Sequence, residues 1–293
     1  AYQYHDLFRE FLLEQCSAHF EGETLTNLKR IAAGVAERSG QEETAIALYA
    51  EIQEWDDLTR VICAMSETWL AQGRYQTLQS SIVQLPPNER DQRPWLYWSG
   101  MSRLVFDPLG ARANLEAAYR QFERTDQDLA GLLLSASGVI ESYYCAVDEM
   151  APTIPWGDQL HRLLAQHQGF PSDAIQAQVM MNLLGLIFAC PHHPLLQELE
   201  RDVDRILPVL DDPASRLGVA AVFLYLPNWR GELHRIRQLL DELTPSLQGS
   251  ALSPRSLVIW RVIEGNYAWN TSNWEQAREK LQTYQKTLEE TKA

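Results

Sequence analysis

Histidines and acidic residues are the side chains of this 293-residue chain that could support metal binding or acid–base chemistry. His192 and His193 are adjacent between two prolines, and adjacent loop residues rarely both ligate one metal ion. There is no HExxH pattern, and no cysteine or carboxylate has a spacing that completes a site. We therefore favour a stiff turn between helices over a metal site. His161 and His167 would point about 240° apart on a helix, so they do not converge.

Two carboxylates, Glu141 and Asp148, are seven residues apart and can share one helix face. A hydrolytic role would require one of them in an apolar pocket that raises its pKa. A solvated helix face is the simpler interpretation, and we prefer it. The sequence has no GxSxG nucleophile signature and no GxxxxGKS/T phosphate loop. We therefore expect no catalytic residue, no metal site and no cofactor bound by these residues.

Aromatic residues with polar neighbours form a third group, concentrated on the first helix of each predicted hairpin. Successive residues differ by about 100° around a helix, so Tyr143 and Tyr144 cannot both face a core. First helices line the concave surface of tetratricopeptide-like solenoids, where ligands and peptides bind. Packing between repeats is the alternative for each aromatic residue. The candidate effector-binding or partner-binding residues are Trp98, Arg103, Glu141, Tyr143, Tyr144, Asn182, Arg216, Arg261 and Asn266.

The elements that must position these side chains are helices, and the sequence predicts an all-α chain of about seven helix pairs. The first helices of these pairs start 31 to 44 residues apart. This period is typical of stacked helical hairpins, because one hairpin cannot bury both of its faces alone. The predicted pairs are 25–38 with 43–53, 56–72 with 74–85, 94–106 with 110–124, 128–150 with 156–167, 172–190 with 195–210, 213–226 with 232–243, and 254–270 with 274–290.

The predicted corners share a pattern, in which an aromatic residue stands where one helix ends and the next begins. These residues are Trp55, Tyr75, Trp229 and Trp274. We expect the ring to plug the corner, while a small residue such as Ala277 lets the paired helices approach. We expect residues 1–22 to be an N-terminal helix continuing from a missing upstream domain. Residues 23–293 are predicted to form a single tetratricopeptide-like superhelix, or α-solenoid.

The composition restricts the partners. The net charge of −14 repels phosphate backbones and anionic lipids, so no direct contact with nucleic acid or membranes is expected. The longest uncharged run, 174–197, has a 12-residue apolar centre, whereas a membrane-spanning helix needs about 20 apolar residues. The four cysteines are scattered and lack a CxxC pattern. We favour reduced core cysteines in a cytoplasmic protein over disulfides or metal ligands.

A family resemblance rests on several segments. The sequence YHDLFREFL at 4–12 resembles the YHxLFRxFL segment of MalT-like, signal-transducing ATPase regulators of transcription. AIALY at 45–49 with WDD at 55–57 resembles a hairpin of that family, and GRYQTL at 73–78 with LP at 85–86 resembles its next turn. The helix pair from Asp107 to Phe122 continues the likeness, which covers residues 4 to 145 and is generic beyond them.

The resemblance implies a cytoplasmic bacterial regulator of the LuxR type, in which an ATPase module switches oligomeric state and a helical arm senses an inducer or an inhibitory partner. This chain has neither the phosphate loop nor a basic helix-turn-helix. We therefore expect the non-enzymatic arm and sensor region, with ATP bound only by a missing upstream domain. The parent would supply any oligomerisation. The alternative is a free-standing tetratricopeptide-type scaffold that docks peptides or proteins.

Overall fold

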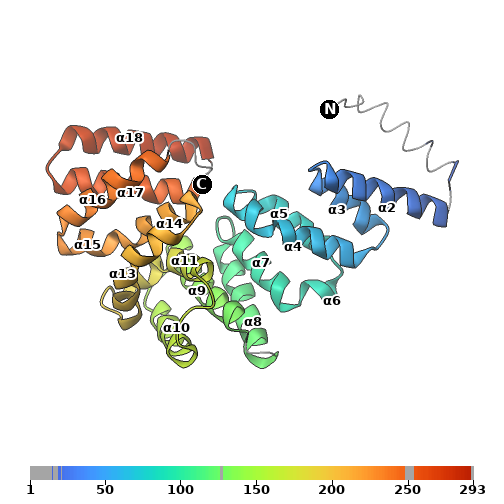
Figure 1. The fold of residues 1–293 in the computed structure, drawn as a ribbon, viewed down its shortest axis with the longest axis horizontal. Coiled ribbons are helices and arrows are strands. Elements are labelled where there is room, and N and C mark those ends of the chain that lie inside the picture. The colour runs from blue at the N-terminus through green and yellow to red at the C-terminus, as the bar shows by residue number, and fades with distance from the viewer. Residues whose placement is uncertain (1–14, 16–18, 21, 126–127, 248–253, 292–293) are drawn as a thin grey trace. The chain divides into compact units, whose positions relative to one another are not determined.

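The structure, a computed structural model, describes residues 15, 19, 20, 22–125, 128–247 and 254–291. Within those ranges the regular secondary structure is helical and contains no strand, which confirms the all-α prediction (Figure 1). The predicted helix over 1–22, including the 4–12 segment, falls almost entirely outside the described residues. Among the described residues, no helix is long and apolar enough to cross a bilayer.

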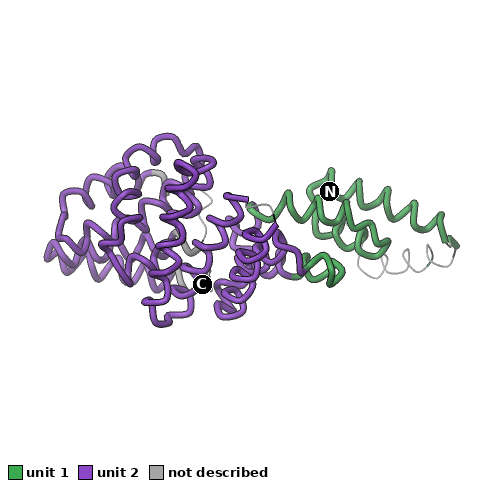
Figure 2. The backbone as a smooth tube through the Cα atoms, turned by 90° about the horizontal axis from the view of Figure 1, so that it is seen from below, with its two compact units in different colours: residues 1–67, 80–90 green, residues 68–79, 91–293 purple. Residues whose placement is uncertain are grey.

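The chain divides into two compact units (Figure 2). Unit 1 comprises residues 1–67 and 80–90, and unit 2 comprises 68–79 and 91–293. Unit 1 contains α2 (Glu23–Arg38), α3 (Glu42–Glu51), α6 (Pro87–Arg90), most of α4 (Trp55–Ala71) and the end of α5 (Tyr75–Val83). The prediction of a single solenoid over 23–293 stays a prediction.

Unit 2 contains the remaining helices. These are α7 (Arg93–Arg103), α8 (Pro108–Thr125), α9 (Leu129–Cys145), α10 (Thr153–His167), α11 (Asp173–Met181), α12 (Leu184–Ala189), α13 (Pro194–Ile206), η1 (Leu207–Val209), α14 (Pro213–Phe223), α15 (Tyr225–Arg230), α16 (Leu233–Leu243), η2 (Thr244–Leu247), α17 (Pro254–Asn270) and α18 (Trp274–Thr291).

Three helix starts in unit 2 agree with the sequence because a local capping side chain sets each of them. The Asp128 carboxylate accepts hydrogen bonds from the backbone N–H groups of Ala130 and Gly131, which starts α9. Ser172 caps α11 and Asp212 caps α14 in the same way. These short polar side chains satisfy N–H groups that the first turn of a helix leaves without acceptors.

Several predicted helices end early or break, among them the helix predicted over 94–106, which ends at Arg103. The helix predicted over 128–150 ends at Cys145. The helix predicted over 213–226 ends at Phe223, because Pro227 has no N–H to donate to the Phe223 carbonyl four residues earlier. The helix predicted over 172–190 is divided into α11 and α12. A Cβ on Gly185 of α12 would lie 2.7 Å from the Ile140 carbonyl oxygen of α9, so the break accompanies a close approach of two backbones.

Packing in unit 2 follows the hairpins. The pairs α7–α8 and α17–α18 each lie side by side (Figure 1). The first helices also pack in series, α9 on α11, α11 on α14 and α14 on α17. Most residues of the core they share are apolar. Its fully buried members include Leu115, Leu133, Ile140, Leu160, Leu186, Ala220 and Trp260.

Two details of the corners and cysteines differ from expectation. Ala277 is buried as predicted, but Trp229 and Trp274 do not plug their corners, because they are 44% and 54% exposed. Each instead packs edge-on against a neighbouring ring, Phe188 or Trp269. The three described cysteines are free thiols, as expected. None of them belongs to the core, since Cys63 is exposed and Cys145 and Cys190 are half-buried.

Candidate functional site

Two of the candidate residues, Glu141 and Asn182, lie inside unit 2 with no exposed surface. The Asn182 amide donates to Ser137 Oγ (3.3 Å), and the Cys145 thiol donates to Glu141 Oε1 (3.3 Å). α9 is buried on nearly every side from Gly131 to Ser142, so its polar side chains face other helices. Both side chains are therefore enclosed between helices, and neither faces an open groove.

Tyr143 is covered by a cation. The Arg112 guanidinium lies 3.3 Å from the centre of the Tyr143 ring, and its Nη1 pairs with Asp148 (3.1 Å). The backbone N–H of Glu149 also donates to the Asp148 carboxylate, and this bond together with Arg112 lowers the pKa of Asp148. Glu141 and Asp148 therefore do not act as a pair: Asp148 lies beyond the end of α9, at the surface, and Glu141 is buried.

The other candidate residues are dispersed over unit 2. Tyr144 packs on Phe188, Trp98 packs on Tyr97, and Arg103 lies 3.9 Å from Asp107. Arg216 Nε donates to the Leu210 carbonyl (2.7 Å), and Asn266 is half-buried on α17. Arg261 pairs with Glu264 (2.6 Å) beside a cleft. The structure does not bring the nine residues together, and their binding role stays a prediction.

The histidine turn has a structural role. His193 is almost completely buried; its Nδ1 accepts from the Leu195 N–H, and its Nε2 lies 3.2 Å from Asp158. His193 thereby caps α13, as a turn residue would. His161 lies 3.1 Å from Glu198. The described part of the chain contains no group of three or more His, Cys, Asp or Glu residues arranged to hold a metal ion.

A cleft of about 630 Å³ lies among α16, η2, α17 and α18 of unit 2. We call it the Glu264 cleft. It is lined by Arg237, Leu240, Asp241, Thr244, Pro245, Glu264, Tyr267, Thr271, Asn273, Gln276 and Lys280. Ligand sites in proteins occupy about 300–1,000 Å³ and combine apolar walls with a few polar groups.

Three charged side chains meet beside the Glu264 cleft, and two of them, Glu264 and Lys280, line it. The Glu264 carboxylate is only 7% exposed, and it accepts from Arg261 Nη1 (2.6 Å) and from Lys280 Nζ (3.0 Å). Arg261 is one turn earlier on α17, whereas Lys280 comes from α18, across the corner. A buried charge is tolerated only when it is paired, so this arrangement fixes α18 against α17. Sequence reasoning found Arg261 but missed Glu264, although the spacing of three residues on a helix indicates such pairs.

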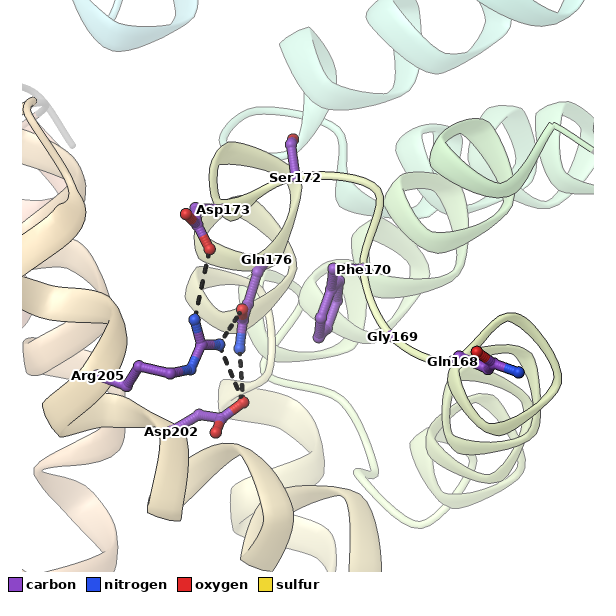
Figure 3. Close-up of a pocket in the computed structure, with 8 residues that line it drawn as sticks. All are labelled: Gln168, Gly169, Phe170, Ser172, Asp173, Gln176, Asp202 and Arg205. Carbon is purple, nitrogen blue, oxygen red and sulfur yellow. Dashed lines mark hydrogen bonds and ion pairs between the residues drawn. The ribbon is translucent and has the colours of Figure 1, made fainter.

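The second cleft, of about 370 Å³, is the Arg205 cleft, shown in Figure 3. It is lined by Gln168, Gly169, Phe170, Ser172, Asp173, Gln176, Asp202 and Arg205. The guanidinium of Arg205 on α13 donates to Gln176 Oε1 (2.8 Å) and pairs with Asp202 (3.3 Å) and Asp173 (3.6 Å). Gln176 is buried and donates in turn to Asp202 (3.1 Å). The carboxylate of Asp202 helps hold the pKa of Arg205 above its usual value.

Comparison with known proteins adds no relative: no protein family and no curated protein matches this chain.

Proposed function

We propose that this chain is a non-enzymatic sensor or arm module that binds an effector and thereby biases an upstream ATPase switch. The parent would be a cytoplasmic bacterial transcription regulator of the MalT-like kind, as the 4–12 and 73–86 segments suggest. In this proposal the hairpins stack as a tetratricopeptide-like solenoid. The serial packing of α9, α11, α14 and α17 supports that arrangement, because each first helix needs its neighbour to complete its burial.

The observation that carries the proposal is the Glu264 cleft. It has the volume of a small-molecule site, apolar walls from Leu240, Pro245 and Tyr267, and a buried carboxylate held by two cations. Its walls come from three successive helices, so an occupant touches α16, α17 and α18 together. A ligand that binds one arrangement of these helices more tightly than another shifts the population toward it.

The first test is a thermal-shift screen of the purified chain against metabolites and nucleotides. A ligand at one hundred times its dissociation constant adds about 2.7 kcal/mol to the free energy of unfolding, which raises the melting temperature by several degrees. Gln276→Trp places an indole in the Glu264 cleft and should abolish the response. The matched control Gln238→Trp changes an exposed position on α16 outside the cleft and should keep it. A screen in which no compound raises the melting temperature contradicts the effector proposal.

A second candidate function is a free-standing scaffold for protein partners, favoured by one surface feature. Phe188, Trp229, Trp269 and Trp274 are exposed, and we call this set the aromatic edge. An Asn270–Asn228 hydrogen bond (2.9 Å) links the end of α17 to α15 within it. The rings contact each other in two pairs, Phe188 with Trp229 and Trp269 with Trp274, and clusters of exposed apolar side chains mark interaction sites. The reading frame upstream separates the two candidates: a phosphate loop there supports the regulator, and a start codon near Ala1 contradicts it.

A further inference from the structure

The group of charges around Glu264 has an excess of positive charge, because Arg261, which does not line the cleft, pairs with Glu264 in addition to Lys280. One carboxylate, Glu264, faces two cations, Arg261 and Lys280, and all three are largely buried. Arg261 and Lys280 retain 21% and 24% of their side-chain exposure, so solvent reaches them only in part. The three groups together carry a net charge of +1 beside a cavity.

Arg261 is the natural partner of Glu264. It lies three residues earlier on the same helix, contacts Oε2 at 2.6 Å and is placed behind the carboxylate, because Glu264 lines the cleft and Arg261 does not. An arginine alone neutralises one carboxylate. Lys280 does line the cleft, and its ammonium has three N–H donors. One of them is directed at Glu264 Oε1, which leaves donors for a second acceptor.

The remaining charges of the cleft cancel each other. Arg237 and Asp241 form an ion pair on α16 (3.5 Å), and both side chains are more than two-thirds exposed. Water screens such a pair, so it contributes little to the field in the cavity. The excess around Glu264 therefore determines the sign of charge that the cleft favours.

We propose that the Glu264 cleft binds a small organic anion. The carboxylate or phosphate group of the ligand accepts hydrogen bonds from Lys280, and its apolar part lies against Leu240, Pro245 and Tyr267. This inference rests on the proposed function and specifies the chemical class of the effector. The Arg205 cleft is a poor site for the same ligand, because Asp173 and Asp202 outnumber Arg205 there.

The test is isothermal titration calorimetry on the full chain with three probes. 4-Phenylbutyrate and phenyl phosphate carry the two anionic groups, and 4-phenylbutyramide is the neutral match of the first. We expect at least one anion to bind, and to bind more tightly than the amide by about tenfold or more, as hydrogen bonds to charged groups require. Stronger binding of phenyl phosphate identifies a phosphate ligand, and stronger binding of phenylbutyrate identifies a carboxylate.

Variants separate a charge effect from loss of structure. Lys280→Met should lower the affinity for the anion by about tenfold or more and leave the affinity for the amide unchanged. Lys280→Arg should restore most of the affinity. Glu264→Gln leaves two cations beside the cleft, so it should tighten anion binding even though it destabilises the fold. Arg205→Met is the control outside the cleft and should leave the affinity for all three probes unchanged.

Equal affinity for amide and anion, or unchanged anion binding by Lys280→Met, overturns the inference. If none of the three probes binds while the metabolite screen yields a neutral or cationic ligand lost in Gln276→Trp, this inference fails and the effector proposal stands. If that screen is also blank, both fail.

Discussion

The Glu264 cleft and the Arg205 cleft contain the same kinds of charged group in opposite proportion. In the first, two cations hold one carboxylate that is 7% exposed. In the second, two carboxylates hold one guanidinium that is 54% exposed. Coulomb energy depends on the surrounding dielectric as well as on distance, so ion pairs of similar length contribute differently to the stability of the fold. Burial therefore decides which cluster supports the fold, and the sign of the excess charge decides which ligand it attracts.

The largest expected difference between the clefts concerns removal of the central group. Glu264→Ala leaves Arg261 and Lys280 together without their carboxylate, and breaking a buried pair costs about 3 kcal/mol or more. We expect this loss in the free energy of unfolding, measured by urea denaturation. A cost below about 1 kcal/mol would show that the two cations reach water freely, and the contrast between the clefts would disappear.

A smaller loss in the free energy of unfolding is expected at Gln176, the buried residue of the Arg205 cleft. Gln176 is 2% exposed and links Arg205 to Asp202 through both ends of its amide. Gln176→Ala removes these hydrogen bonds while Arg205 and Asp202 keep access to water, so the cost should be about 1 kcal/mol. The matched control is Gln178→Ala, which makes the same change at a half-buried position of α11. Urea denaturation of both variants measures the difference, and equal costs would show that the bridge adds nothing.

The smallest effect is expected at the centre of the exposed cluster. Arg205→Met should cost less than about 1 kcal/mol, because exposed ion pairs gain little over hydration. That cost should vanish in about 1 M NaCl, where the screening length falls to about 3 Å. The same salt should leave most of the Glu264→Ala effect in place. A salt-resistant cost at Arg205 would show that its pairs are shielded from solvent and would remove the distinction.

Local signals explain how much of the fold the sequence predicts. Asp128, Ser172 and Asp212 each lie directly before a helix and cap it within three residues, so the starts of α9, α11 and α14 follow from short patterns. The end of α14 also has a local cause in Pro227. The break between α11 and α12 does not, since the contact of Gly185 with Ile140 joins two residues from different hairpins.

The candidate site is harder to predict for the same reason. Glu141 and Asn182 qualify as polar residues on first helices, but a helix buried all round gives no sign of which face meets a groove. Arg261 does lie beside a cleft, as a member of an ion pair within one helix. The partnership of Glu264 with Lys280 spans a helix corner, and only the packing of α18 on α17 creates it.

The tryptophans differ in exposure, so the intrinsic fluorescence of the chain has a buried and an exposed component. Trp69 and Trp260 are completely buried, and Trp260 immediately precedes Arg261 behind the Glu264 cleft. Trp229, Trp269 and Trp274 on the aromatic edge are in contact with water. A soluble quencher such as acrylamide reaches the second group and is kept from the first. A partner that covers the edge would therefore protect the second group from the quencher and leave the emission of Trp69 and Trp260 unchanged.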